Sequence, residues 1–195
     1  MATSLTHKKI SLCMISLNEE PFIARALENV KPYVDEIIIV DGGSRDKTVE
    51  IAKNFGAKVY YSQWKNNFSK QRDISLKYAT GDWILIMDPD EIYEKGFLDR
   101  LQLYANNNIG VNMFAVPRKN YIGGKQTNAY PDRQLRFFPN HHGIRYKKRV
   151  HEVPTGYNLI ASPTNLHIIH KKTSRRQAKQ NAYYATLERK KAKSA

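Results

Sequence analysis

The stretch Gly81-Asp-Trp-Ile-Leu-Ile-Met-Asp-Pro-Asp-Glu91 predicts a buried strand that ends in three carboxylates. Residues 83–87 form a continuous apolar run of strand length, and its lack of alternation is typical of a parallel sheet covered on both faces. Pro89 has a fixed φ and no backbone N–H, so the chain must leave the sheet there. Because ligands of open α/β sheets bind at the carboxyl ends of strands, we expect the three carboxylates to face a ligand.

These carboxylates, Asp88, Asp90 and Glu91, repel one another unless a cation lies among them. Oxygen ligands suit a hard divalent ion such as Mg²⁺ or Mn²⁺, and Mg²⁺ commonly takes one or two carboxylates together with water and substrate phosphates. An ordinary Asx-Pro turn with solvated acids is the alternative, and an Asp-x-Asp pair alone does not separate the two. The buried strand before the pair favours a metal–diphosphate site.

Composition places the chain among ordinary globular proteins. It has 195 residues, 41% hydrophobic and 26% charged, enough for one domain with a sizeable core. Its apolar runs are too short to span a bilayer, residues 1–9 show no signal peptide, and the single cysteine excludes an internal disulfide. Together these features predict a cytoplasmic protein.

Charge is divided unevenly along the chain. Residues 1–116 carry 14 Lys and Arg against 15 Asp and Glu, whereas residues 117–195 carry 18 against 3. The first part predicts a neutral catalytic scaffold. The second predicts either a surface that attracts polyanions (nucleic acid, acidic lipid headgroups, phosphorylated saccharide) or a self-repelling surface without a specific partner. Residues 171–195 predict a basic helix that either lies on an anionic membrane or packs as a solvated helix.

Apolar runs and helix signals alternate over the first 90 residues. Strands are expected over 10–17, 36–40, 57–61 and 83–87, and helices over 21–29, 47–54 and 66–79. This order predicts an α/β fold, a Rossmann-like, doubly wound, mostly parallel sheet with helices on both faces. Further along, we expect a helix over 97–105, strands over 113–116, 134–138 and 166–169, a long functional loop over 118–132, and a helix over 174–191.

Carboxyl ends of neighbouring parallel strands meet at one edge of a sheet, so residues 17–20, 41–46 and 88–91 are expected to line a ligand crevice. In the second segment, the glycines of Asp41-Gly-Gly-Ser44 permit a tight turn and a close approach to a ligand. Ser44 or Asp46 is expected to cap the next helix, whose N-terminal N–H groups favour an anion.

Six ordered motifs resemble those of family 2 glycosyltransferases with the GT-A fold. They are Ser16-Leu-Asn-Glu-Glu20, Ile38-Ile-Val-Asp-Gly-Gly-Ser-Arg-Asp-Lys-Thr48, Phe68-Ser-Lys-Gln-Arg-Asp73, Gly81 to Glu91, Tyr130-Pro-Asp-Arg-Gln-Leu-Arg-Phe-Phe138 and Val150-His-Glu152. The resemblance covers about residues 8–170 and is nearest to the subgroup of lipopolysaccharide-core glucosyltransferases. It implies one domain, 1–195, with a nucleotide-sugar and metal half (8–116), an acceptor-side half (117–170) and a basic C-terminal helix (171–195).

The resemblance implies an inverting transfer from a nucleotide diphosphate-sugar, most often a UDP-sugar, to a hydroxyl of a saccharide or lipid-linked glycan. The implied donor-binding residues are Leu17, Asn18, Glu20, Asp41, Gly42, Ser44, Arg72 and Asp88. Asp88, Asp90 and His170 are the implied ligands of Mn²⁺ or Mg²⁺. Two positions depart from the family pattern: Pro89 replaces a small residue, and Asp73 replaces Asn and is expected to add negative charge near the nucleotide.

Such a transfer needs a base that takes the acceptor's proton. The resemblance assigns this role to Glu152, in the His-Glu motif, with Asp132 as the competing carboxylate. The alternative is that Glu152 only pairs with Arg149 or Lys148 in the preceding basic run. On the late strand, His167 is expected on the face opposite His170.

Arg133 and Arg136 lie on opposite sides of Gln134 in the sequence. We expect them either to reach the acceptor or diphosphate or to be ordinary surface arginines. Two functions compete with the glycan transferase: a glycosyltransferase that modifies nucleic acid, and a polyanion-binding module on a transferase scaffold. The retained site carboxylates argue against the module. A nucleotidyltransferase is disfavoured because it normally needs a basic, Gly-rich loop after the first strand, whereas Asn18-Glu-Glu-Pro21 is acidic.

Overall fold

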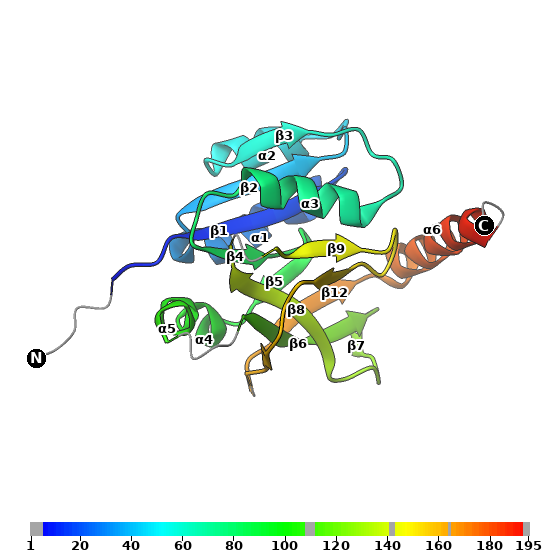
Figure 1. Cartoon of the computed structure of the whole chain (residues 1–195). Helices are drawn as coiled ribbons and strands as arrows, with labels where there is room; N and C mark the ends of the chain where they lie inside the picture. Colours follow the sequence, from blue (N-terminus) through cyan, green and yellow to red (C-terminus); the bar gives the residue numbers. More distant parts are fainter. Residues whose placement is uncertain (1–5, 108–111, 141–142, 164, 193–195) are drawn as a thin grey trace, which may run out of the picture.

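One mixed sheet runs through the protein in the order β3-β2-β1-β4-β8-β6-β12-β5, as the computed structural model shows (Figure 1). The structure describes residues 6–107, 112–140, 143–163 and 165–192. The strands of this path are β1 (Ile10–Ser16), β2 (Glu36–Asp41), β3 (Lys58–Tyr61), β4 (Trp83–Ile86), β5 (Glu91–Tyr93), β6 (Met113–Ile122), β8 (Asp132–Pro139) and β12 (Ile168–Lys172). The short strands β7 (Lys125–Gln126) and β11 (Ile160–Ala161) pair with β6, and β9 (Arg145–Lys147) and β10 (Val153–Thr155) form a separate pair.

The N-terminal half of the sheet confirms the predicted α/β architecture. Strands β1, β2, β3 and β4 all pair in parallel. From β8 onward the sheet is mixed, because β8 runs antiparallel to both β4 and β6, whereas β12 is parallel to β6. The helices are α1 (Glu20–Val30), α2 (Thr48–Asn54), α3 (Phe68–Tyr78), α4 (Lys95–Leu98), α5 (Leu101–Asn106) and α6 (Ser174–Ala192), with a short 3₁₀ helix at Lys31–Tyr33.

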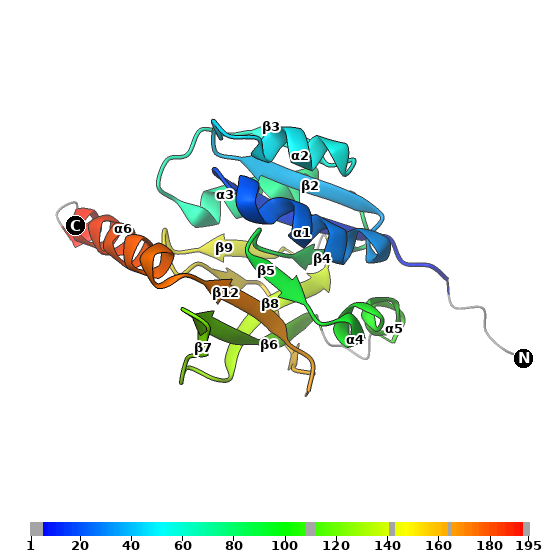
Figure 2. The same ribbon diagram turned by 180° about the vertical axis from the view of Figure 1, so that it is seen from behind.

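Helices cover both faces of this half, as the two opposite views show (Figures 1 and 2). Leu12 and Ile39 lie in the core cluster under α1 and α2, whereas Cys13 and Ile38 lie in the cluster under α3. Successive strand residues point to opposite faces, which is why two clusters form from one continuous apolar run. Cys13 is the small core residue that the sequence predicts, and burial raises the pKa of its thiol to about 12.

The prediction of a loop over 118–132 is wrong for residues 118–122, which form the end of strand β6. Strand β6 continues to Ile122, and β8 already begins at Asp132. Pairing with β8 on one side and β12 on the other supplies ladder hydrogen bonds to a segment whose Gly-, Asn- and Tyr-rich composition favours a loop. As a result, Arg118 and Asn120 stand on a rigid central strand. Glu91, which the sequence places in a turn, likewise begins the short strand β5.

Helix α6 forms where the basic helix is predicted and projects beside the sheet's edge (Figure 2). Among the described residues, no helix combines the length and the apolar character needed to cross a bilayer.

Gly81 precedes β4 and lies against the backbone at the start of β1. A Cβ at this position would lie 2.6 Å from Ser11 Oγ and 2.8 Å from the Lys9 carbonyl oxygen. We expect Gly81→Ala to lower the free energy of unfolding by about 1–3 kcal/mol, because the crowded neighbours include backbone atoms. Urea denaturation measures the change, with Lys77→Ala, an exposed position of α3, as a control within about 0.5 kcal/mol of wild type. A Gly81→Ala midpoint equal to the wild-type midpoint would contradict this account.

Candidate active site

A cleft of about 1150 Å³ opens at the carboxyl ends of β1, β2 and β4. Its wall includes strand β6, strand β8, the segment 151–154 and the inner face of α6. This is the edge where the sequence predicts a ligand, and a volume of this size suits a nucleotide-sized molecule.

Asp41 organises the part of this edge that follows β2. Its carboxylate accepts hydrogen bonds from the hydroxyls of Ser16 (3.0 Å) and Ser44 (2.6 Å) and from the backbone N–H groups of Gly43 and Ser44 (both 2.8 Å). The Ser44 hydroxyl also accepts from the Asn18 N–H at 2.8 Å. Asp41 is only 3% exposed, so in this structure it holds the loop in place rather than facing the cleft.

The predicted donor residues therefore divide into two groups. Leu17, Arg72 and Asp88 line the cleft. Asn18, Glu20, Asp41, Gly42 and Ser44 form a frame behind it, in which Glu20 accepts from the Lys47 N–H at 3.1 Å. Gly42 packs closely against the cleft residue Trp64, since a Cβ at Gly42 would lie 3.2 Å from the Cβ of Trp64.

Two arginines clamp Asp88. Arg72 Nη2 donates to Asp88 Oδ1 and Arg136 Nη2 donates to Oδ2, both at 2.8 Å. Arg72 Nε also donates to Glu152 Oε1 at 2.7 Å, so the partner of Glu152 is Arg72 rather than the predicted Arg149 or Lys148. Burial raises the pKa of Asp88, but the Arg136 and Arg72 guanidinium groups outweigh it and hold that pKa well below the usual range.

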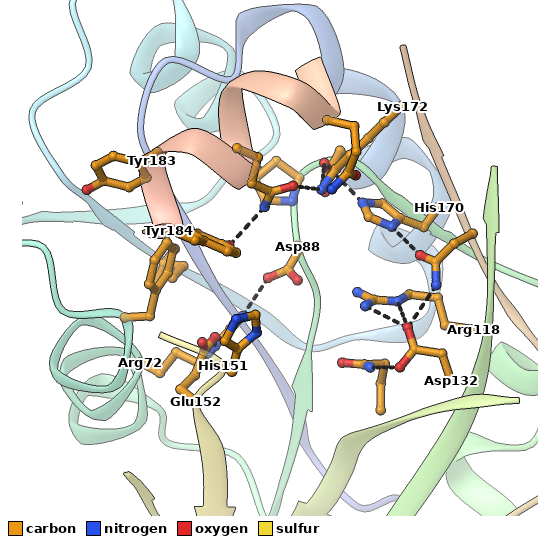
Figure 3. Close-up of a pocket in the computed structure, with 18 of the residues that line it drawn as sticks. Arg72, Asp88, Arg118, Asp132, His151, Glu152, His170, Lys172, Tyr183 and Tyr184 are labelled. Carbon is orange, nitrogen blue, oxygen red and sulfur yellow. Dashed lines mark hydrogen bonds and ion pairs between the residues drawn. The ribbon is translucent and has the colours of Figure 1, made fainter. Parts of the chain in front are cut away.

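The ion pairs continue beneath the cleft. Arg136 Nη2 donates to the fully buried Glu91 at 2.7 Å, and Arg118 Nη1 donates to the same Glu91 oxygen at 2.9 Å. Arg118 also contacts Asp132 Oδ2 at 2.8 Å (Figure 3). The resulting series of alternating charges, here called the ion chain, is Glu152, Arg72, Asp88, Arg136, Glu91, Arg118 and Asp132. The sequence marks Arg136 only as a candidate and does not single out Arg118.

Asp90 and His170 meet on the other side of the cleft. His170 Nε2 lies 3.2 Å from Asp90 Oδ2, and His170 Nδ1 lies 2.6 Å from Asn120 Oδ1. Lys172 Nζ and Arg176 Nη2 approach the same Asp90 oxygen at 3.6 and 3.3 Å. Burial raises the pKa of Asp90, but the bond from His170 and the charges of His170 and Lys172 lower it overall.

The donor set fits a divalent ion that is shared with a substrate. In residues 6–107, 112–140, 143–163 and 165–192, no group of three or more His, Cys, Asp or Glu side chains forms a self-sufficient metal cage. Asp90 and His170 would contribute one oxygen and one nitrogen, which suits Mg²⁺ or Mn²⁺ that completes its shell with phosphate and water. Asp88 fits less well, because both of its oxygens already accept from arginines.

Several buried polar atoms in the cleft wall lack a protein partner among the described residues. They are Gln71 Oε1, Arg72 Nη1, Arg136 Nε and the Tyr146 hydroxyl. Buried polar groups are normally hydrogen-bonded, so these atoms indicate that a polar ligand or ordered water belongs beside them.

Other predicted residues lie outside this arrangement. Asp73 accepts from the Tyr146 N–H at 2.8 Å and lines a separate pocket rather than the cleft, so its effect on a nucleotide stays a prediction. His167 Nδ1 lies 3.1 Å from Glu94 Oε2, away from Asp90, as expected for the opposite face of β12. The Arg133 side chain hydrogen-bonds Ser162 rather than a site carboxylate, although Arg133 borders the cleft.

Helix α6 lines one side of the cleft. Arg176 pairs with Glu19 at 2.8 Å and lies over the Phe22 ring, 4.2 Å from its centroid. Near the other rim, the Tyr183 hydroxyl accepts from Trp64 Nε1 at 2.6 Å, and Tyr184 packs edge-on against Phe68 (ring centroids 5.6 Å apart). Trp64 and Asn66 are lining residues that the sequence motifs do not include, whereas Phe68 begins one of them.

The sequence profile of Glycosyl transferase family 2 matches residues 11–161, which include the frame, the clamp on Asp88, Asp90 and Glu152. The chain belongs to glycosyltransferase family 2. Family membership and the helix-covered sheet described above both agree with the predicted GT-A fold.

The chain is similar to two curated proteins and one solved structure, among others. A TPR repeat-containing protein of Synechococcus elongatus is 38% identical over 74% of this chain, and the prophage-derived glycosyltransferase SunS of Bacillus subtilis is 32% identical over 76%. Each match covers 35% of the relative, so the chain spans about a third of their length. Residues 1–349 of S. aureus TarS with UDP-GlcNAc superpose with a TM-score of 0.65 at 16% identity, over 84% of this chain and 58% of TarS, which shows the fold. The lipopolysaccharide-core subgroup stays a prediction.

Proposed function

We propose that this chain transfers a sugar from a UDP-sugar to a hydroxyl of a saccharide or lipid-linked glycan, with inversion at the anomeric carbon. The observation that carries the proposal is one cleft that contains Asp90 beside His170 and, separately, Glu152 held by Arg72. Family membership supplies the class of reaction. UDP is proposed because the TarS structure, whose fold is shared, contains UDP-GlcNAc.

The donor is proposed to lie along the carboxyl ends of β1, β2 and β4. The frame around Asp41 holds the loop after β2 rigid, so no ordering of this loop is needed when the nucleotide binds. Arg72 Nη1 and the Tyr146 hydroxyl, which have no partner among the described residues, are proposed to donate to oxygens of the bound donor.

Asp90 and His170 are proposed to hold Mn²⁺ or Mg²⁺ together with the diphosphate, and Asp88 to position the arginines instead of binding the ion directly. When bound, the ion neutralises the charge that develops on the leaving diphosphate. Lys172 and Arg176 already face Asp90 and add positive charge on the same side of the cleft.

Glu152 is proposed as the base that takes the acceptor's proton. Its Oε1 is fixed by Arg72, whereas Oε2 has no hydrogen-bond partner among the described residues and remains available to a hydroxyl. The Glu152 side chain is 13% exposed and lines the cleft, so it is accessible to a substrate without being dispersed in solvent.

A donor-hydrolysis screen tests the function. The purified protein is incubated with UDP-, GDP- and dTDP-sugars, with Mn²⁺, Mg²⁺ or EDTA, and the released nucleotide is measured. We expect release from a UDP-sugar that depends on the metal. Equal release with EDTA would contradict the metal role, and release only from GDP- or dTDP-sugars would contradict the UDP assignment.

A further inference from the structure

We propose that Asn120, oriented by Asp132, fixes the ring of His170 in the tautomer that leaves Nε2 free to bind the metal. This makes Asn120 and Asp132 positioning residues, and it rests on the proposed function because it needs His170 to be a ligand. Figure 3 shows the row of contacts that runs from Arg118 through Asp132 towards His170.

The orientation of the Asn120 amide follows from what surrounds Asp132. Asp132 Oδ2 accepts from Arg118 Nε at 2.9 Å and from Asn120 at 2.8 Å, while Oδ1 accepts from Gln134 Nε2 at 2.6 Å. A carboxylate in contact with a guanidinium group is ionised and can only accept. The Asn120 atom that faces Asp132 must therefore be the amide nitrogen, which leaves the amide oxygen for the other side.

The tautomer of His170 follows from the orientation of that amide. The Asn120 oxygen lies 2.6 Å from His170 Nδ1 and offers only lone pairs, so Nδ1 must carry the hydrogen. A neutral imidazole protonated on Nδ1 has its lone pair on Nε2. This is the nitrogen that lies 3.2 Å from Asp90 Oδ2, and second contacts of this kind commonly orient histidine ligands of metals.

The sheet holds these groups in register. Strand β6 is paired on both sides, with Asn120 directly opposite His170 on β12 and Arg118 directly opposite Asp132 on β8. Neighbouring strands lie about 4.8 Å apart, so side chains on one face of three adjacent strands are close enough to form such a row. Because the row stands on strands rather than loops, the contact from His170 Nδ1–H to Asn120 is in place before any ligand arrives, and it keeps Nε2 as the nitrogen directed at Asp90.

The same contacts argue that Asp132 is not the base. Its two oxygens accept from three side chains, Arg118, Asn120 and Gln134. Burial raises the pKa of Asp132, but the Arg118 charge and these hydrogen bonds lower it overall, which weakens its attraction for an acceptor proton. A role in orienting Asn120 explains why this carboxylate is surrounded by donors.

The test compares four full-length proteins: wild type, Asn120→Leu, Asp132→Asn, and the double variant Asn120→Asp with Asp132→Asn. Mn²⁺ affinity is measured by electron paramagnetic resonance with UDP present, and thermal unfolding checks the fold. We expect Asn120→Leu to weaken Mn²⁺ binding by roughly 10–100-fold, in the range of other lost contacts to metal-binding histidines. Asp132→Asn is expected to weaken Mn²⁺ binding by less, because the Asn120 amide is still present but is no longer held in one orientation.

The double variant exchanges the acid and the amide, so a carboxylate accepts from His170 Nδ1 and from the new amide. We expect it to restore Mn²⁺ affinity to within about 3-fold of wild type, which a merely structural role would not produce. Nitrogen-15 NMR of the metal-free proteins adds a second readout: a hydrogen on Nδ1 of His170 in wild type and the double variant, and its loss in Asn120→Leu, where only the Nε2–H that faces Asp90 keeps an acceptor.

The outcomes separate the two proposals. Wild-type Mn²⁺ affinity in folded Asn120→Leu, or a double variant as weak as Asn120→Leu, overturns the role of Asn120 while leaving the proposed function intact. Should Asn120→Leu fail to fold, Asp132→Asn and the double variant still decide between these results. No Mn²⁺ binding by the wild-type protein with UDP would instead overturn the metal role itself, and this inference with it.

Discussion

Glu152→Gln is expected to lower the rate constant for sugar transfer by about 10²–10⁴-fold while leaving donor affinity close to wild type. The glutamine carbonyl still accepts from Arg72 Nε, so the 2.7 Å contact that positions this side chain is retained. What disappears is the basic oxygen that takes the acceptor's proton. Single-turnover transfer with a saturating UDP-sugar separates this loss from any change in binding.

Glu188→Gln is the matched control for this variant. Glu188 lies on α6 with its side chain 58% exposed and contacts His151, the neighbour of Glu152, at 3.6 Å. The same chemical change there is expected to leave the rate within about 2-fold of wild type, as for most surface substitutions. Near-normal transfer by Glu152→Gln would contradict the assignment of Glu152 as the base.

Asp90→Asn is expected to abolish the gain in UDP affinity that Mn²⁺ provides, a loss of roughly 100-fold or more. It removes a ligand itself, so its effect exceeds the 10–100-fold typical of residues that only orient a ligand. Calorimetric titration of UDP with and without Mn²⁺ measures the difference. Asp99→Asn is the control, because Asp99 forms an exposed ion pair with Lys95. Unchanged Mn²⁺ dependence of UDP affinity in Asp90→Asn would contradict the assignment of Asp90 as a metal ligand.

Asp88→Asn tests whether the two aspartates have different roles, with Asp90 binding the metal and Asp88 positioning the arginines. Asp88 pairs with Arg72 and Arg136, whose side chains are 6% and 5% exposed, so neutralising it leaves two buried cations short of a partner. We expect the main effect to be a lower free energy of unfolding, by up to about 3–5 kcal/mol, with the Mn²⁺ dependence of UDP binding retained. Loss of that dependence at unchanged stability would return Asp88 to the ligand set.

Much of the fold was predictable because its signals are local. The apolar run over 83–87 and the turn at Pro89 are set by neighbouring residues, so the strand and the position of Asp90 at its end follow from the sequence. The same holds for Asp41 and its glycines, whose turn closes through hydrogen bonds within four residues.

The other wall of the cleft was not predictable in this way. Arg118 and Asn120 lie in a segment whose composition favours a loop, and only pairing with two distant strands makes it part of β6. A weak signal exists, since Arg118, Asn120 and Ile122 alternate as strand residues do. Nothing local indicates that Arg118 reaches Glu91, a contact between residues 27 positions apart.

Charges alternate in sign along the ion chain, so its members cannot change independently. Replacing one alone leaves a neighbour with uncompensated charge below the surface, whereas replacing two adjacent members together keeps the row balanced. Among related enzymes, substitutions in the ion chain are therefore expected to occur in pairs, at two adjacent members together. A chimaera that imports Arg136 from one parent and Glu91 from another is expected to fold only if both parents carry the same pairing.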